Sequence, residues 1–417
     1  MKSVAIIGAG LAGLSLALAL HKHGITCTIY ELRPPTTKAY GALMLSPNAL
    51  RILDSLGVYD RIRDKGYHFE EIIFKDAEEQ TTERYFLGSE KQYGYKALRI
   101  YRQILLNELR EMVKEAGLKV YYERKFSHIV SEDPNKMTFA FTDGSMEEAT
   151  LLVGADGIHS TVRKYISPVA PIYSGQLAIT CAIPISKLDF PPNSDYTLPV
   201  GIFAKPGAFV MAPQDLNGEE VLAGTQCAYP EQDRAGWESL YSAKADLLHL
   251  FQKDMDDWPS VVQFALRNVP VDTLAVWPYY IVPKLKSWTS SSEQVLILGD
   301  AAHAIPPTAG QGASQAFEDS HTLAALLARF WMGPWKSLPK GVLTVWQNLR
   351  QERVDKVIAL TLRLNNARLP QAEREKLGEN EVWQNGKDGD LAWLYNEHVA
   401  ERLFERIDVA DFGNPAK

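Results

Sequence analysis

The order of apolar and polar positions at the start of the chain predicts a strand, a tight turn, a helix and a second strand. Residues 4–7 are all apolar, which is typical of a strand buried on both faces. Gly8, Gly10 and Gly13 then punctuate an apolar stretch of helical length, and the next apolar run ends in Glu31. A strand, a helix and a strand in this order form the βαβ unit of a parallel sheet.

Helix and strand signals continue through the first third of the chain. Ser46 and Pro47 suit the N-cap and first turn of a helix, and Gly57 suits its end. A second helix is predicted over residues 102–116, where leucines recur with helical spacing before Gly117. Strands are predicted over residues 118–122, 137–141 and 149–153.

The pattern changes for a long stretch in the middle of the chain. Short alternating runs separated by prolines fill residues 173–285, which predicts a mostly antiparallel sheet with a helix over residues 243–251. A buried-strand pattern returns at residues 294–298, and a long helix is predicted over residues 313–331. The elements predict an α/β protein: a Rossmann-like domain with a parallel sheet, an inserted mostly antiparallel sheet, and C-terminal helices over residues 336–417.

The composition restricts the class of protein. The chain has 417 residues, of which 46% are hydrophobic and 23% charged, as in soluble globular proteins of two or three domains. The net charge of −7 offers no basic surface to nucleic acid. Its three cysteines lie far apart, so we expect no disulfide framework, no metal site and a reducing, cytoplasmic location. No apolar run reaches the ~18 residues of a membrane span, and glycines break the pattern of a secretory signal.

The glycine turn carries the first chemical signal. Gly8 permits the tight turn, Gly10 lets the backbone approach a pyrophosphate, and Gly13 lets the helix pack closely on the strand. The helix N-terminus adds unpaired N–H groups and the positive end of the helix dipole. Glu31 lies about twenty residues further on, where a carboxylate accepts hydrogen bonds from the hydroxyls of an adenosine ribose. The segment therefore predicts a dinucleotide site.

Two further motifs come directly after predicted strands. The first is Gly154-Ala155-Asp156-Gly157, and the second is Gly299-Asp300-Ala301-Ala302-His303, followed by Pro306 and Gly310-Gln311-Gly312. Together with the glycine turn, these motifs resemble the single-component FAD-dependent aromatic hydroxylases, the group of salicylate and para-hydroxybenzoate hydroxylases. The resemblance implies an FAD-binding domain over residues 1–172 and 286–335, a substrate domain over residues 173–285 and a C-terminal helical region over residues 336–417.

The resemblance assigns cofactor contacts beyond the glycine turn. Asp300 is expected to accept hydrogen bonds from the ribityl chain or, through water, from the pyrophosphate. Arg102 is expected near the pyrophosphate, where a guanidinium offsets phosphate charge, and Arg99 is the other arginine that the match allows. The residues expected beside the pyrimidine edge of the flavin are Gly310, Gly312 and Ala313. A helix N-terminus there stabilises the negative charge of reduced flavin.

Several of these residues have alternative roles. Asp300 also suits a helix cap, and Arg102 suits an exposed helix face. His303 is either a base or a residue that holds the loop by hydrogen bonds. Asp156 is either architectural or a contact of a nicotinamide dinucleotide, and Arg33, in the loop after the second strand, is expected to contact the cofactor.

The activity that the resemblance implies is that of an FAD-dependent monooxygenase. It would hydroxylate or epoxidise a small aromatic, alkene or secondary-metabolite substrate with O2 through a flavin C4a-hydroperoxide, which needs a dry pocket. No second complete glycine motif is present, so NADPH or NADH is expected to dock transiently as reductant. The alternatives are a dehydrogenase or reductase on the same fold and a catalytically silent ligand-binding protein; flavin halogenases are disfavoured because their Trp-x-Trp-x-Ile signature is absent. We expect a monomer or a homodimer.

The substrate contacts are the least determined. Tyr279 and Tyr280 are candidates to orient the substrate, and only one of two successive side chains on a strand can face the cavity. In some members of the family an arginine clamps a phenolate oxygen, whereas the approximate match here is Thr180 or Cys181. This departure leaves neutral aromatic, indole-like and alkene substrates open.

Overall fold

A five-stranded parallel sheet forms one half of the molecule. The computed structural model describes residues 2–134, 136–192, 194–384, 390–410 and 412. The sheet order is β18-β12-β1-β2-β8, and every neighbouring pair is parallel, which confirms the predicted Rossmann-like sheet. The strands are β1 (Ser3–Ile7), β2 (Thr26–Tyr30), β8 (Lys119–Tyr121), β12 (Leu151–Gly154) and β18 (Val295–Ile297).

Three helices pack beside this sheet and bury their apolar residues with it in one core. They are α1 (Leu11–Lys22), α5 (Arg102–Glu115) and α11 (Gly312–Leu327). α1 contacts both of the others, so the first helix of the chain is held between two later ones. The predicted long helix is confirmed, although it ends in a π-helical turn (Ala328–Met332).

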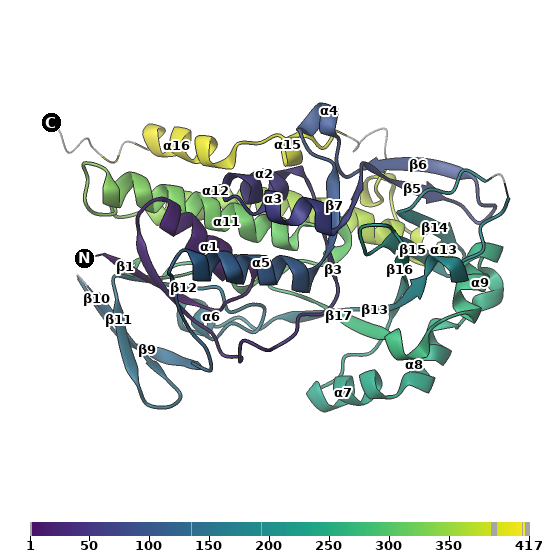
Figure 1. The fold of residues 1–417 in the computed structure, drawn as a ribbon, viewed down its shortest axis with the longest axis horizontal. Helices are drawn as coiled ribbons and strands as arrows, with labels where there is room; N and C mark the ends of the chain where they lie inside the picture. The colour runs from purple at the N-terminus through teal and green to yellow at the C-terminus, as the bar shows by residue number, and fades with distance from the viewer. Residues whose placement is uncertain (1, 135, 193, 385–389, 411, 413–417) are drawn as a thin grey trace.

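A seven-stranded sheet forms the other half of the molecule (Figure 1). Its order is β17-β13-β16-β15-β14-β5-β6, and every neighbouring pair is antiparallel except β14 and β5. The strands are β5 (Glu71–Lys75), β6 (Thr81–Phe86), β13 (Ile172–Pro184), β14 (Val200–Ala204), β15 (Gly207–Pro213), β16 (Glu220–Ala228) and β17 (Ala275–Ile281). The mostly antiparallel sheet is confirmed, and it also takes in two strands from far earlier in the chain.

Helices cover one face of the seven-stranded sheet. They are α7 (Arg234–Ser242), α8 (Lys244–Phe251) and α9 (Ser260–Arg267). Ile179 and Cys181 of β13 belong to the core between these helices and the sheet. Because side chains alternate along a strand, Ala178 and Thr180 lie on the opposite, inner face.

A three-stranded antiparallel sheet lies between the two large sheets (Figure 1). It consists of β3 (Ala42–Leu45), β7 (Ala97–Tyr101) and β4 (Tyr67–Phe69) in that order. Leu98 and Ile100 of β7 belong to the core of the parallel-sheet half, whereas Tyr101 donates a hydrogen bond to the Glu220 carboxylate of β16. A second three-stranded sheet is formed by β9 (Phe126–Asp133), β10 (Lys136–Phe141) and β11 (Met146–Ala149).

The C-terminal region is helical, as predicted, and its main helix joins the two halves. α12 (Val342–Ala367) begins beside Glu293, which accepts a hydrogen bond from the Gly341 N–H at 3.0 Å. It ends beside the turn between β14 and β15, where Gln371 N–H donates to the Lys205 carbonyl at 3.1 Å. α16 (Val399–Val409) packs against α11 and α12.

Short helices complete the described chain. They are α2 (Pro47–Ser55), α3 (Tyr59–Ile62), α4 (Glu90–Tyr93), α6 (Thr161–Ile166), α10 (Asp300–His303), α13 (Gln371–Arg374) and α15 (Ala392–Tyr395). Among the residues that the structure describes, no helix combines the length and the apolar character needed to cross a bilayer.

Candidate functional site

The sequence motifs follow four neighbouring strands of the parallel sheet. In the order β18-β12-β1-β2, the strands lead to Gly299, Ala155, Gly8 and Glu31. Because the strands are parallel, these positions meet at one edge of the sheet. That carboxyl edge is where open α/β sheets bind nucleotides.

The three glycines of the first turn differ in what surrounds them. Gly8 has a φ of +109°, and a Cβ there would lie 2.4 Å from the Ala155 carbonyl oxygen. A Cβ on Gly13 would lie 2.0 Å from the Gly8 carbonyl oxygen, so helix α1 packs directly on the turn. A Cβ on Gly10 would have no described atom within 4 Å. No described atom of the protein therefore requires glycine at position 10.

Glu31 ties the glycine turn to the loop that follows β2. Its Oε2 accepts a hydrogen bond from the Ala9 N–H at 2.6 Å, and its Oε1 accepts one from the Arg33 N–H at 2.9 Å. The Arg33 side chain is exposed. The Glu31 carboxylate thus stands beside the first N–H groups of the turn, and each of its oxygens can accept a further hydrogen bond from a ribose hydroxyl.

Asp156 caps a helix. Its Oδ2 accepts hydrogen bonds from the N–H groups of Thr161 and Val162 at 2.7 and 3.2 Å, at the start of α6. Burial raises the pKa of this carboxyl, and these hydrogen bonds oppose the rise. The observed contacts are those of the architectural alternative.

Asp300 and His303 stand at opposite ends of α10. Asp300 is the exposed first residue of α10. It follows Gly299, and a Cβ on Gly299 would lie 3.3 Å from the Cβ of Ala12 in α1. His303 is buried, and its Nε2 lies 2.6 Å from Asp319 Oδ2. The same carboxylate oxygen accepts a hydrogen bond from the Gly299 N–H at 2.9 Å. His303 therefore holds the loop in place, and Asp300 presents its carboxylate at the edge of the sheet.

The N-terminus of α11 follows the loop over residues 305–312. Gly310 has a φ of +65°, and a Cβ there would lie 3.5 Å from Met44 Cβ of β3. Gly312 and Ala313 open the helix, and a Cβ on Gly312 would have no described atom within 4 Å. The first turn of α11 thus lies beside the three-stranded sheet, and its first N–H groups have no acceptor within the helix.

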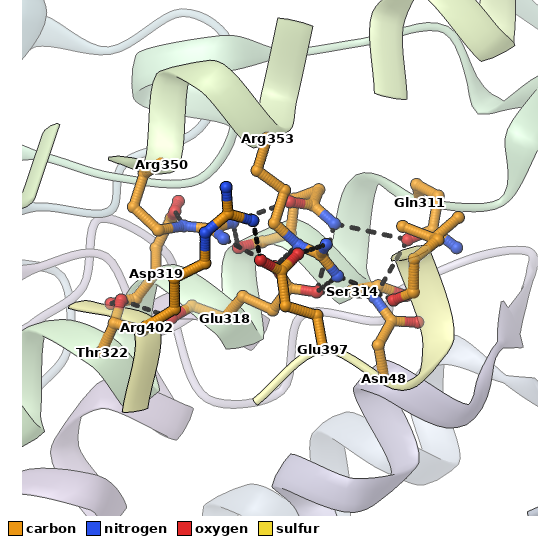
Figure 2. A network of polar contacts seen from close by, with 12 residues as sticks. Asn48, Gln311, Ser314, Glu318, Asp319, Thr322, Arg350, Arg353, Glu397 and Arg402 are labelled. Atoms are coloured by element: carbon orange, nitrogen blue, oxygen red, sulfur yellow. Dashed lines mark hydrogen bonds and ion pairs between the residues drawn. The ribbon is translucent and has the colours of Figure 1, made fainter. Parts of the chain in front are cut away.

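A buried polar network fixes this helix start (Figure 2). Gln311 is fully buried; its Nε2 donates to Ser46 Oγ at 2.8 Å, and its Oε1 accepts from Asn48 Nδ2 at 3.1 Å. Asn48 also donates to Glu318 Oε1 at 2.7 Å. Ser46 and Asn48 begin α2, so the network ties the loop before α11 to a helix far away in sequence.

The network continues into α12 through two arginines (Figure 2). Arg350 donates to Asp319 Oδ1 at 2.8 Å and to Glu318 Oε2 at 2.6 Å. Arg353 donates to both oxygens of Glu318, at 2.5 and 2.8 Å, and also to Glu397. Burial alone would raise the pKa of Glu318, but the two arginines outweigh it and lower the pKa to about 2. The sequence analysis missed this network.

Arg102 and Arg99 lie in different environments. Arg102 is the first residue of α5, half-buried, and its N–H donates to the Gly41 carbonyl at 2.9 Å. Arg99 is buried in the middle of β7.

The two candidate tyrosines are separated by strand alternation. Tyr279 is buried; burial raises the pKa of its hydroxyl, and the charge of Arg368 opposes the rise. The Tyr280 hydroxyl accepts a hydrogen bond from Trp237 Nε1 of α7 at 3.2 Å. Tyr279 is therefore the one directed away from the covering helix.

Among the described residues, no group of three or more His, Cys, Asp or Glu side chains is placed to hold a metal ion.

Comparison with known proteins agrees with this geometry. Residues 1–234 and 284–357 match the family model described as FAD binding domain. The chain is 28% identical to 3-amino-4-hydroxybenzoate 2-monooxygenase of Streptomyces cremeus, over 94% of each chain. It is 27% identical to 6-hydroxynicotinate 3-monooxygenase of Bordetella bronchiseptica, over 85% of this chain and 89% of the relative. A solved salicylate hydroxylase in complex with its substrate has the same fold, with a TM-score of 0.77 and 18% identity over 97% of this chain and 98% of that one.

The family match covers well over half of the chain, and the relatives align along nearly its whole length. The predicted resemblance to the FAD-dependent aromatic hydroxylases is confirmed, and with it the class of FAD-dependent monooxygenases. The chain belongs to the FAD binding domain family.

Proposed function

We propose that this protein uses FAD, O2 and either NADPH or NADH to add one oxygen atom to a small aromatic substrate, by hydroxylation or epoxidation. The observation that carries the proposal is the meeting of the cofactor motifs at the ends of four neighbouring parallel strands. At Gly10 and Gly312, unlike at Gly157, neither a positive φ nor a neighbouring described atom accounts for the glycine. A ligand that approaches the backbone at both places accounts for these glycines.

The residues fit FAD along one line of the sheet edge. Glu31 would hold the ribose, the turn at Gly10 the pyrophosphate, and Asp300 the ribityl chain. The N-terminus of α11 at Gly312 would face the pyrimidine edge of the flavin. Arg102 and Arg33 are the proposed cationic contacts of the phosphates. Bound FAD would supply the redox chemistry and the activation of O2, which amino-acid side chains alone do not provide.

The residues of the chain would bind the cofactor, orient the substrate and exclude water from the site. The N-terminus of α11 would stabilise negative charge on a flavin ring bound there. The inner face of the seven-stranded sheet, with apolar residues such as Ala178, Val210 and Phe203, would exclude water from the substrate. Tyr279 is the candidate to orient the substrate, since Tyr280 is bonded to α7.

The names of the relatives indicate the class of substrate. The enzymes from Streptomyces cremeus and Bordetella bronchiseptica are named for oxidation of hydroxylated aromatic rings, a benzoate and a nicotinate. We infer a substrate of similar size for this chain. We also infer a cytoplasmic monomer or homodimer.

The experiment is a visible absorption spectrum of the purified protein, followed by NADPH or NADH oxidation in air with a panel of hydroxylated benzoates, hydroxynicotinates, indoles and alkenes. The proposal predicts a bound flavin and oxidation of one nucleotide that a single class of compound accelerates, with an oxygenated product. Protein that stays colourless after incubation with FAD would contradict it. Substrate oxidation without oxygen in the product would favour the dehydrogenase alternative.

A further inference from the structure

One buried charge in the molecule has no protein partner among the described residues. Arg99 is 6% exposed. Its Nε is buried without a hydrogen-bond partner, and no carboxylate of the described chain pairs with its guanidinium. Burial is the cause that lowers the pKa of Arg99, to about 10, and no neighbouring charge opposes it.

This contrasts with the other arginines of the interior. Arg350 and Arg353 are equally buried, and each is bound to carboxylates. Arg163 is buried as well, and its guanidinium donates to three backbone carbonyls, those of Val169, Ala301 and Ile158. A buried cation without such partners is strongly unfavourable, so a partner from outside the chain is the physical expectation for Arg99.

The register of β7 shows which way Arg99 faces. Arg99 pairs with Met44 of β3 and with Tyr67 of β4, and directly paired residues of an antiparallel sheet share a face. Met44 lies against Gly310 in the loop before α11. The Tyr67 ring lies against Gly218 in the turn between β15 and β16, since a Cβ on Gly218 would be 3.2 Å from it. Arg99 therefore sits between the proposed flavin edge and the seven-stranded sheet.

Tyr101 confirms this orientation independently. It lies two residues further along β7, on the same face as Arg99. Its hydroxyl donates to Glu220 of β16, whose Oε1 also accepts from Gln214 Nε2 at 3.3 Å. The described acid on this side is thus engaged by Tyr101 and Gln214, and it does not neutralise Arg99.

We propose that Arg99 is the substrate-binding residue that recognises a carboxylate on the aromatic ring. A guanidinium presents two parallel N–H donors that match the two oxygens of a carboxylate. Its place between Met44 and Tyr67 sets the carboxylate beside the loop of Gly310, with the ring directed toward the inner face of the seven-stranded sheet. The strand in which some relatives carry a clamping arginine has Thr180 and Cys181 here, so the positive charge comes from a different sheet. This inference rests on the proposed function.

An anionic group of the flavin is the other source of negative charge for Arg99. The two sources differ in what they affect. A flavin contact would change FAD affinity and the reduction potential of the flavin. A substrate contact would change the preference for an acid over its uncharged amide and leave FAD affinity unchanged.

The test is a titration of the FAD-loaded protein, followed by perturbation of the flavin absorption spectrum. The ligands are 3-hydroxybenzoate, 3-amino-4-hydroxybenzoate and 6-hydroxynicotinate, each paired with its carboxamide. The wild type should bind at least one acid about tenfold or more tightly than its amide. Arg99→Met should abolish that preference and leave the amide within about threefold of wild type, and Arg99→Lys should retain part of the preference. Arg84→Met removes the same charge from an exposed ion pair with Glu71 and should change nothing.

A second measurement guards against misfolding. If Arg99 is an uncompensated buried charge, Arg99→Met should raise the melting temperature of the FAD-loaded protein without ligand. A lower melting temperature combined with an unchanged acid preference would overturn the proposal. So would reduced FAD affinity or a shifted flavin potential with the acid preference intact, and so would failure of all three acids to bind the wild type. These readouts need only FAD and ligand binding, so they stay separate from a failure to oxygenate, which would contradict the proposed function.

Discussion

Arg353→Met should destabilise the protein more than any exposed ion-pair variant, because Arg353 uses its full set of donors. Its Nε and two terminal nitrogens donate to Glu318, to Glu397 and to the carbonyls of Trp393 and Leu394. A guanidinium has five N–H donors, and all five are engaged. The substitution leaves Glu318 buried with Arg350, Asn48 and Gln315 as its remaining side-chain partners.

The magnitude follows from two routes. Breaking a buried ion pair by removal of one partner costs about 3–5 kcal/mol. The pKa of Glu318 falls from its ordinary value of 4.5 to about 2 in spite of burial, a net shift of about 3 kcal/mol to which Arg353, Arg350 and Asn48 contribute. The loss of the carbonyl and Glu397 contacts adds to the share of Arg353, so we expect about 3 kcal/mol. That is a rise of about a hundredfold in the unfolding equilibrium constant.

The assay is urea unfolding of wild type and variant at pH 7, followed by circular dichroism and by flavin release. Arg406→Met is the matched control. Arg406 of α16 also pairs with a residue of α12, Glu352, but the Arg406 side chain is 47% exposed. That variant should lose at most about 1 kcal/mol. Equal losses for the two variants, or a loss below about 1 kcal/mol for Arg353→Met, would refute the reasoning that the buried network holds α12 to α11.

Three further predictions use other contacts. Gly10→Ala should leave the melting temperature near that of wild type but weaken FAD binding about tenfold or more. Gly13→Ala should instead destabilise the fold by about 1–3 kcal/mol or more, because its Cβ would strike the Gly8 carbonyl. Thermal melts with FAD titration check both variants, and an equal effect at the two positions would count against the assigned roles. The pKa of the Glu318 carboxyl is lowered, so the stability that this carboxylate contributes is complete above its ordinary pKa and is lost as the pH falls toward about 2. In urea unfolding, the difference in stability between wild type and Glu318→Gln should therefore shrink from pH 5 to pH 3. A constant difference would contradict this prediction. Burial raises the pKa of the Cys181 thiol to about 12, so native protein should label at Cys181 with a thiol reagent at pH 7.5 far more slowly than urea-unfolded protein, and equal rates would contradict its placement.

The parallel sheet was predictable because its signals are local. The apolar run of β1, the glycines after it and Glu31 after β2 lie within one short stretch, and each residue has its own steric or chemical reason. Asp300 likewise lies close after the buried strand β18, whereas Gly310 follows only after α10 and a loop. By contrast, β5 is a short apolar run and β6 an alternating one, and nothing in those residues shows that β5 pairs with β14, far later in the chain.

The buried charges were not predictable for a related reason. Arg350 and Arg353 are spaced three residues apart on a helix of mixed charge, as solvated residues often are, and their partner Glu318 belongs to another helix. The one available signal was the pair Glu318-Asp319 inside a helix that has no lysine or arginine of its own, since buried acids require partners. From the sequence, Arg99 was considered only as an alternative to Arg102 for the contact near the pyrophosphate. The role proposed for Arg99 rests on the face of β7 on which it lies and on its lack of a partner among the described residues.

The most direct test of the central claim is turnover of the FAD-loaded protein under ¹⁸O₂ in ordinary water, with mass spectrometry of the product. A monooxygenase predicts one ¹⁸O atom in each product molecule and one NADPH or NADH oxidised for each coupled turnover. A product that contains no ¹⁸O, formed while the flavin is reduced and reoxidised, would contradict the account and assign the chain to hydride transfer.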